Sequence, residues 1–299
     1  MLIRLAYDIQ FDLPAPAAMI ALLNVHPSRA QDLLEPDEMQ TEPALPITSY
    51  TDGFGNRCSR IVAPAGQLRL SSSTLIQDSG LPDPVNFSAR EIPVGDLPND
   101  VLPYLLNSRY CEVDRFTSIA YELFGQVAPG WNRVQYICDW VHNHVTFNYQ
   151  HARPTKSALD VYTERVGVCR DFQHLAVTFC RAMNIPARYA TGYLGDIGVP
   201  VRLPMDFSAW FEAWLDGRWW SFDARNNVPR IGRILMATGR DTSDVAMTTA
   251  FGRADLTYFY VVTEEETNSG AGTTSDVAKP TYVGAEATCS EVEARPSLA

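Results

Sequence analysis

The sequence predicts an α+β fold, in which a β-rich, sandwich-like N-terminal domain precedes a core of helices and antiparallel strands. In the first hundred residues, apolar and β-branched segments are separated by turn signals. From about Asp114 onward, apolar residues recur at helical spacing, and strand-like segments return after Pro186. Strands and helices that are segregated along the chain in this way are typical of α+β proteins.

Three segments of the N-terminal part are expected to form strands: Leu2–Phe11, Ala18–His26 and Leu68–Gln77. Turn signals such as the Asp-Gly-Phe-Gly-Asn run at 52–56 lie between them and favour an antiparallel sheet or sandwich. The stretch from Ile92 to Pro103 is rich in Pro, Asp and Asn and predicts a linker. We therefore expect a β-rich domain over residues 1–95, a second domain over 105–263 and a disordered tail over 264–299.

The second domain is expected to contain four helices. Their boundaries follow from capping residues, from apolar residues at helical spacing and from helix-ending Gly or Pro. They are a helix that Asp114 caps and that ends at Phe124, a helix from Trp131 to about Val145, a short helix that the Ser157–Asp160 capping box opens, and a central helix from about Val168 to Met183.

Strand-like segments follow the central helix, at Ala187–Leu194, Phe207–Leu215, Arg218–Asp223 and Leu256–Thr263. Asp216-Gly217 between two apolar segments predicts a tight hairpin, with Leu215 opposite Arg218. This register would place Asp223 opposite Trp210 and Ser208 opposite Arg225. Ser208 and Asp223 would then be diagonal neighbours on one face, roughly 7–8 Å apart.

Composition narrows the classes of function. The chain of 299 residues carries a net charge of −11 and has no basic cluster, which argues against nucleic acid as a partner. It contains no run of eighteen apolar residues and no signal-peptide pattern, so we expect a cytoplasmic protein without a membrane partner. The six scattered cysteines suggest neither a zinc site nor a disulfide framework, and no motif indicates a metal, nucleotide or other cofactor.

Cys169 differs from the other cysteines because it occupies the first turn of the predicted central helix. Unpaired N–H groups and the positive end of the helix dipole lie there, and both favour a thiolate nucleophile. Arg170 adds a nearby positive charge, whereas Cys180 at mid-helix is expected only to pack. From its position alone, Cys169 fits equally well as an activated nucleophile and as a small buried apolar residue.

Residues 157–194 and 206–230 resemble the bacterial transglutaminase-like family, of the cysteine protease type. The resemblance rests on SALDVYTERVGVCRDFQHLAVTFCRAMNIPARYATGYL and on MDFSAWFEAWLDGRWWSFDARNNVPRIGR, in that order. The first hundred residues, with YTDGFGN at 50–56, resemble the β-rich N-terminal domain of that family. The likeness therefore extends over most of the chain.

The resemblance implies a papain-like core, in which a helix bearing a cysteine packs on an antiparallel sheet, and a Cys-His-Asp triad. It assigns the nucleophile to Cys169 and the orienting carboxylate to Asp223. Such a cysteine attacks an amide of a peptide or protein substrate and forms a thioester, which water or an amine then resolves. No cofactor and no metal are implied.

The chain departs from this pattern where the triad histidine is expected. That position is Ser208, and a second expected histidine position is Asn226. A serine hydroxyl cannot act as a general base near neutral pH, and of the five histidines only His151, in the loop before the cysteine segment, is a candidate substitute. An enzyme that hydrolyses or transfers amides, a catalytically impaired binding protein, and a serine introduced to trap substrate all remain open.

Overall fold

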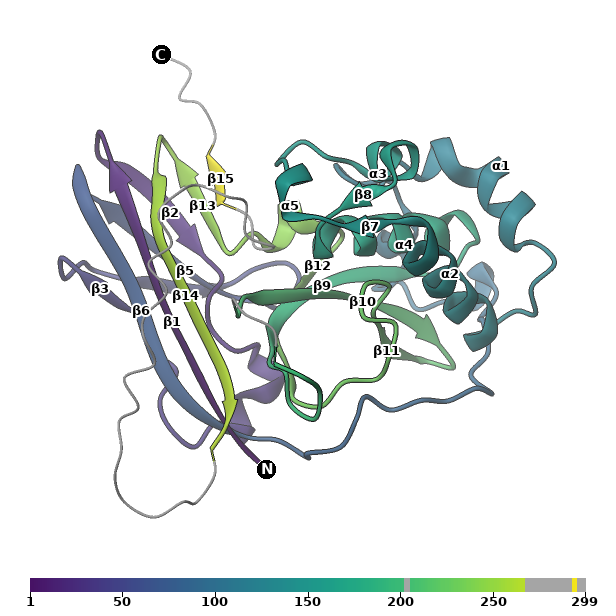
Figure 1. Ribbon diagram of the computed structural model, residues 1–299, viewed down its shortest axis with the longest axis horizontal. Coiled ribbons are helices and arrows are strands. Elements are labelled where there is room, and N and C mark those ends of the chain that lie inside the picture. Colours follow the sequence, from purple (N-terminus) through teal and green to yellow (C-terminus); the bar gives the residue numbers. More distant parts are fainter. Residues whose placement is uncertain (202–204, 267–291, 295–299) are drawn as a thin grey trace.

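Two β-sheets that face each other form the N-terminal part of the computed structural model, which describes residues 1–201, 205–266 and 292–294 (Figure 1). The first sheet has the order β14-β1-β6-β3, and the second has the order β15-β13-β2-β5-β4. Their strands are β1 (Leu2–Leu13), β2 (Ala17–Ala21), β3 (Gln40–Glu42), β4 (Thr48–Thr51), β5 (Arg57–Ala63), β6 (Gly66–Gln77), β13 (Thr248–Phe251), β14 (Asp255–Glu265) and β15 (Val292–Ala294).

Alternation along β1 explains why these sheets stack. Ile3, Leu5, Tyr7, Ile9 and Phe11 are buried, whereas the residues between them are at most half-buried. The buried side chains meet those of β2 and β5 in a single apolar core between the sheets. The sandwich-like N-terminal architecture expected from the sequence is therefore confirmed.

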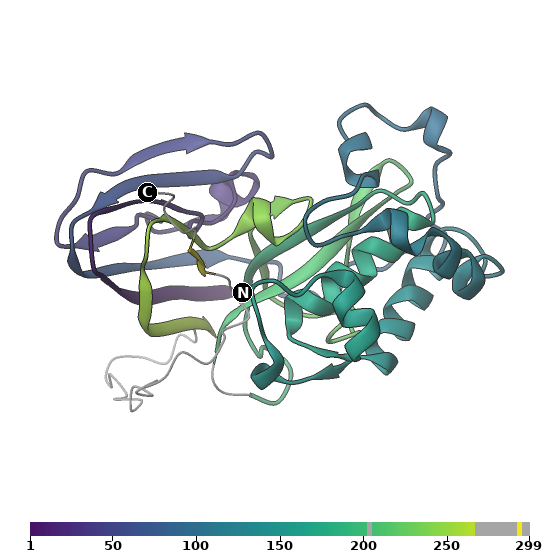
Figure 2. The same ribbon diagram turned by 90° about the horizontal axis from the view of Figure 1, so that it is seen from above.

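A third, antiparallel sheet with the order β11-β10-β9-β12 forms the centre of the other half. Its strands are β9 (Ala187–Leu194), β10 (Phe207–Leu215), β11 (Arg218–Phe222) and β12 (Arg233–Gly239). The helices are α1 (Val113–Phe124), α2 (Trp131–His144), α3 (Ala158–Glu164), α4 (Cys169–Ala182) and α5 (Thr242–Val245). Helix α4 packs against β9 and β10 and is surrounded by α1, α2 and α3, so that every one of its residues is buried (Figures 1 and 2). This is the expected cysteine-bearing helix on an antiparallel sheet.

Short elements complete the connections between these layers. The parallel pair β7 (Thr146–Phe147) and β8 (Val166–Gly167) leads into α4. The described residues also contain the 3-10 helices η1 (Pro27–Asp32), η2 (Val94–Asp96), η3 (Leu102–Leu105) and η4 (Tyr149–His151). Helix η2 lies within the stretch predicted to be a linker, and η3 begins there. No helix in the described part of the chain combines the length and the apolar character needed to cross a membrane.

The strand predicted at Leu256–Thr263 exists as β14, but it does not join the third sheet. It pairs with β1, with Val261 opposite Tyr7, so the chain returns to the N-terminal sandwich after the helical half. The division into separate domains at residues 95 and 105 stays a prediction. Most of the predicted disordered tail, residues 267–291 and 295–299, lies outside the described residues.

The Asp216-Gly217 hairpin is confirmed in its turn and its register. Leu215 lies opposite Arg218, and both turn residues have positive φ, 47° and 80°, as a tight two-residue turn requires. The ladder ends at the pair Phe211–Phe222, however, and the expected pair of Trp210 with Asp223 does not form.

The cause of this early ending is local. The Asp223 carboxylate accepts hydrogen bonds from the backbone N–H groups of Arg225 and Asn226, which turns the chain away from β10. The start of one helix also differs from the expectation, because α1 begins at Val113 rather than after Asp114. The predicted Ser157–Asp160 capping box of α3 is present.

Candidate active site

Cys169 is the first residue of α4 and is buried. The chain reaches it through Gly167, where an added Cβ would come within 2.6 Å of the Asp171 carboxylate. That carboxylate accepts a 2.9 Å hydrogen bond from the N–H of Val168 and so fixes the segment just before the helix. The sequence thus places the cysteine at a helix start, where the first N–H groups have no partner within the helix, as its position predicted.

The positive charge expected from Arg170 is largely used within this segment. Its guanidinium donates to Asp171 at 3.1 Å and to the backbone carbonyl of Arg153. Burial raises the pKa of Asp171, and the charge of Arg170 opposes that shift. Arg170 therefore rigidifies the helix start.

Cys169 belongs to a small cluster of buried residues. Tyr189 on β9 and Ala209 on β10 belong to the same buried cluster, and Phe147, Tyr149 and Ala152 border it. Cys169 is disulfide-bonded in the structure, so its thiol becomes available as a nucleophile only when this bond is reduced. The free cysteines in the described part of the chain are all buried: Cys58, Cys111, Cys138 and Cys180.

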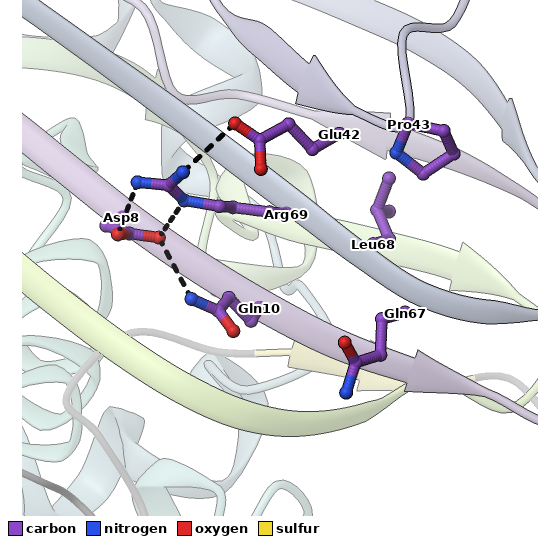
Figure 3. Close-up of a pocket in the computed structure, with 7 residues that line it drawn as sticks. All are labelled: Asp8, Gln10, Glu42, Pro43, Gln67, Leu68 and Arg69. Carbon is purple, nitrogen blue, oxygen red and sulfur yellow. Dashed lines mark hydrogen bonds and ion pairs between the residues drawn. The ribbon is translucent and has the colours of Figure 1, made fainter.

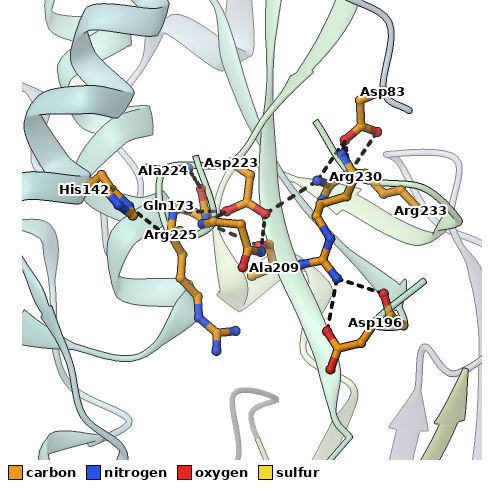
Figure 4. A network of polar contacts seen from close by, with 12 residues as sticks. Asp83, His142, Gln173, Asp196, Ala209, Asp223, Ala224, Arg225, Arg230 and Arg233 are labelled. Atoms are coloured by element: carbon orange, nitrogen blue, oxygen red, sulfur yellow. Dashed lines mark hydrogen bonds and ion pairs between the residues drawn. The ribbon is translucent and has the colours of Figure 1, made fainter. Parts of the chain in front are cut away.

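Asp223, with 6% of its surface exposed, is held by five hydrogen bonds (Figure 4). Its carboxylate accepts from the side chains of Gln173 at 3.1 Å, Asn226 at 2.8 Å and Arg233 at 3.5 Å, and from the N–H groups of Arg225 and Asn226, both at 3.0 Å. Burial acts to raise the pKa of Asp223, but the charge of Arg233 and the bonds from Asn226 outweigh it, and the pKa is lowered. Asp223 is an ionised, fully engaged carboxylate.

Gln173 connects Asp223 to the cysteine helix. It lies one turn after Cys169 on the same face of α4, and its amide nitrogen also donates to the carbonyl of Ala209 at 3.2 Å. Its amide oxygen accepts from the N–H of Ala224 at 3.2 Å. Sequence reasoning missed Gln173, although its i+4 spacing from Cys169 was a signal that could have found it.

Ser208 lies on β10 directly before Ala209, the residue that contacts the Cys169 cluster. It is 7% exposed, it faces Gly192 on β9, and its carbonyl accepts from the Thr191 hydroxyl at 3.2 Å. Within the described ranges, no hydrogen bond joins the Ser208 side chain to Asp223. The structure therefore brings the cysteine helix, the strand of Ser208 and Asp223 together through Gln173, without an imidazole between them.

The five histidines lie elsewhere. The Nδ1 atom of His142 is 2.9 Å from the carbonyl oxygen of Arg225, and His144 stacks on Trp140. His174 is buried against Tyr110, with its Nε2 atom 2.5 Å from the hydroxyl of Thr242, and His26 caps η1. His151 is exposed in η4, between Tyr149 and Ala152, which border the Cys169 cluster.

Comparison with known proteins identifies the family of this chain. Residues 117–224 match the model of the transglutaminase-like superfamily. A solved structure from Cytophaga hutchinsonii, described as "a putative cysteine protease", is 31% identical to this chain. The match covers 88% of this chain and 90% of the Cytophaga hutchinsonii chain, with a TM-score of 0.75. The chain belongs to the transglutaminase-like superfamily.

Two further matches to this transglutaminase-like protein are weaker. An uncharacterized protein of Mycobacterium leprae (strain TN) is 27% identical over 220 residues, which are 70% of this chain and 77% of that protein. The periplasmic domain of TgpA from Pseudomonas aeruginosa is 17% identical, with a TM-score of 0.37, and the match covers 74% of this chain and 87% of that domain.

Proposed function

We propose that this protein binds peptide or protein amides in a transglutaminase-like cleft of the cysteine protease type, and that its turnover of them is impaired. One observation carries this proposal: the position beside the cysteine helix where a base is needed is Ser208, and Asp223 already has its hydrogen bonds filled. A peptide amide as ligand is supported by the superfamily and by the Cytophaga hutchinsonii relative.

The absence of an imidazole at position 208 affects two proton transfers in thiol acyl transfer. The Cys169 thiol must lose its proton to attack the carbonyl carbon, and the departing amine must gain a proton when the C–N bond breaks and the thioester forms. An imidazole performs both transfers, whereas a serine hydroxyl holds its proton near neutral pH. A positioned base contributes about 10²- to 10⁴-fold to the rate, so we expect slow acylation rather than none.

The contacts of Asp223 support the same proposal. A triad aspartate must offer one oxygen to the N–H of the histidine, which it orients. Here the Asn226 amide and the Gln173 amide occupy the two oxygens, at 2.8 Å and 3.1 Å. Asp223 therefore fixes the turn after β11 and ties it to α4.

Restoring the imidazole tests the proposal. Ammonia or amine release from a peptide glutamine amide is measured, with a thiol reductant present, for the wild type, Cys169→Ala, Ser208→His and the double variant Ser208→His with Asn226→His. We expect a wild-type rate that is low but above that of Cys169→Ala, and a rise of about 10²-fold or more in at least one histidine variant. The exposed Ser88→His is the matched control and should behave as the wild type.

Two results would contradict impaired turnover. One is wild-type turnover that Cys169→Ala abolishes and that Ser208→His does not increase. The other is a lack of any gain in both histidine variants while both retain the wild-type fold by circular dichroism.

A second candidate is a working thiol enzyme that uses His151 as its base. It is favoured by the position of His151 between Tyr149 and Ala152, both of which border the Cys169 cluster. The substitution His151→Gln would then remove wild-type turnover. The substitution His144→Gln, at the last residue of α2, would leave turnover unchanged.

A further inference from the structure

Polar side chains of the sandwich are engaged in two different ways. On the outer face of the first sheet, Arg69 lines a hollow and pairs with Asp8 at 2.9 Å and with Glu42 at 3.0 Å, so these charges are balanced within the sheet (Figure 3). The loop between β4 and β5, residues 52–56, instead reaches across to the third sheet. This loop is the Asp-Gly-Phe-Gly-Asn run of the sequence, and the proposed thiol chemistry does not use it.

Hydrogen bonds within this loop fix the side chain of Asn56. The Asp52 carboxylate accepts from the N–H groups of Phe54 at 2.8 Å and Asn56 at 2.9 Å, and from the side-chain amide of Asn56 at 2.9 Å. Gly55 has a φ of 87°, a left-handed conformation that glycine adopts without strain. The loop therefore holds Asn56, which is fully buried, in a single orientation.

Asn56 bonds to β12 in the manner of a neighbouring strand. Its amide nitrogen donates to the carbonyl of Thr238 at 2.9 Å, and its amide oxygen accepts from the N–H of Thr238 at 2.8 Å. The ladder between β12 and β9 shifts its register between Leu235 and Ala237, and a bulge of this kind weakens a ladder locally. The N–H of His26 donates to the carbonyl of Leu235 at 2.9 Å. The sandwich thus holds β12 on both sides of its bulge.

The strand that Asn56 holds contributes to the cluster of the nucleophile. Ala237, the residue before the bonded threonine, belongs to the same buried cluster as Cys169. The sandwich contributes Leu22 and Cys58 to this cluster, and Cys58 comes two residues after Asn56. Cys58 is 2% exposed and Cys169 is fully buried, so a molecule in solution reaches either sulfur only when part of the cluster moves.

We propose that Asn56 is a positioning residue, through which the sandwich holds β12 in the Cys169 cluster and limits access to the thiol. The pair of hydrogen bonds with Thr238 is the connection. When it breaks, β12 can move at its bulge and Ala237 moves with it. This inference concerns access to the thiol, so it does not depend on whether Ser208 impairs turnover.

Site-resolved thiol labelling of the full chain tests the proposal. The protein is reduced, freed of reductant and treated with iodoacetamide at about pH 8, and the labelled peptides are quantified over time by mass spectrometry. In Asn56→Ala we expect Cys169 and Cys58 to be labelled at least about tenfold faster than in the wild type, because two hydrogen bonds to β12 are lost. Cys138 and Cys180 lie in the separate core of the helical half, and their labelling should change by less than about twofold.

Asn24→Ala is the matched control. Asn24 is 1% exposed and its side-chain amide donates to the carbonyl of Asp37 at 2.9 Å, so this variant removes a buried hydrogen bond that stays within the sandwich. We expect it to leave the labelling of Cys169 unchanged. Equal acceleration in Asn24→Ala and Asn56→Ala, or equal acceleration of all buried thiols in Asn56→Ala, would show a general loosening and overturn the proposal. Unchanged labelling of Cys169 in a folded Asn56→Ala would overturn it as well.

The wild type provides a second test that needs no variant. The amide hydrogen of Thr238 exchanges with solvent only when its bond to Asn56 breaks, and the opening constant from this exchange is compared with the one from the labelling of Cys169. We expect the two constants to agree within about tenfold. A thiol that becomes labelled while the Thr238 amide stays protected would overturn the proposal, even if Asn56→Ala failed to fold.

Discussion

The side-chain amide of Gln173 donates a 3.1 Å hydrogen bond to the carboxylate of Asp223 and binds these two residues into one buried unit. The same amide also bonds Ala209 and Ala224, so a single side chain joins α4, β10 and the turn after β11. These are the three elements on which the superfamily resemblance places the cysteine, the histidine position and the aspartate. Their relative placement therefore depends on a residue outside the triad.

Replacing Gln173 with Glu should destabilise the fold. The variant has nearly the same shape, but it removes the donor to Asp223 and Ala209 and brings a second carboxyl group beside a buried carboxylate. We expect the free energy of unfolding in urea to fall by roughly 3 kcal/mol at pH 7. Gln126→Glu, at an exposed position after α1, should change it by less than about 0.5 kcal/mol. Equal effects of the two substitutions would show that Gln173 does not connect these elements.

The lowered pKa of Asp223 predicts a pH dependence of stability. Burial acts to raise this pKa, but Arg233 and Asn226 lower it below the unfolded value. The charged form therefore stabilises the fold above the unfolded pKa, and this contribution is lost as the pH falls through the folded pKa. The loss of unfolding free energy in Asp223→Asn should be largest near neutral pH and shrink below about pH 4. The exposed Asp100→Asn should show no such trend, and a constant difference across the pH range would contradict the prediction.

His174 should affect stability at a higher pH than Asp223 does. Its burial lowers the pKa well below the usual value, so the folded protein holds a neutral imidazole, whereas the unfolded chain takes up a proton near pH 6.5. Stability should fall as the pH drops below about 6.5, by at most about 1.4 kcal/mol per pH unit for this one group. Urea unfolding of His174→Gln should show a weaker slope between pH 6.5 and 4, with His151→Gln keeping the wild-type slope. Identical slopes in the wild type and His174→Gln would refute the assignment.

Gly217 provides a test of the hairpin. Its φ is 80°, and an added Cβ would meet no atom within 4 Å, so Gly217→Ala isolates the cost of the left-handed backbone. We expect the unfolding free energy to fall by about 1–2 kcal/mol. Gly53→Ala, at an equally open glycine that is not among those of positive φ, should be neutral or slightly stabilising. A neutral Gly217→Ala would show that the turn is not left-handed.

The sequence predicted an element well where its apolar residues recur at a regular spacing and a clear turn or helix-ending residue bounds it. The strands Ala187–Leu194 and Phe207–Leu215 have the predicted boundaries, and the Asp216-Gly217 turn fixed the hairpin register. The helix of Cys169 was predicted within one residue at each end because its apolar spacing and its terminating Pro186 agree. The positions of Cys169 and Ser208 along these elements followed from the same patterns, whereas Asp223, predicted to end the strand opposite Trp210, lies in the turn after β11.

Such local patterns could not predict contacts between segments that are distant along the chain. The sequence of β14 is that of an ordinary strand, and it does not indicate that Val261 pairs with Tyr7 rather than with a strand of the third sheet. The turn at Asp223 ended β11 early because side-chain bonds to Arg225 and Asn226 compete with the ladder. The i+4 spacing of Gln173 from Cys169 placed it on the right face of the helix, but its partners Asp223, Ala209 and Ala224 lie on other elements and could not be predicted from that spacing.

The rate of Cys169 alkylation against pH tests the absence of a paired imidazole most directly. The protein is reduced, freed of reductant and treated with iodoacetamide between pH 4 and 9, and the modified Cys169 peptide is quantified by mass spectrometry. A thiolate held beside a protonated histidine stays reactive in acid, whereas an unpaired thiol loses its reactivity with its own titration. We expect the wild type to show a single titration with no reactivity left at pH 5, and Ser208→His to gain a plateau below pH 6. A wild-type plateau at pH 5, or no alkylation of Cys169 at any pH, would contradict a retained thiol nucleophile that lacks its base.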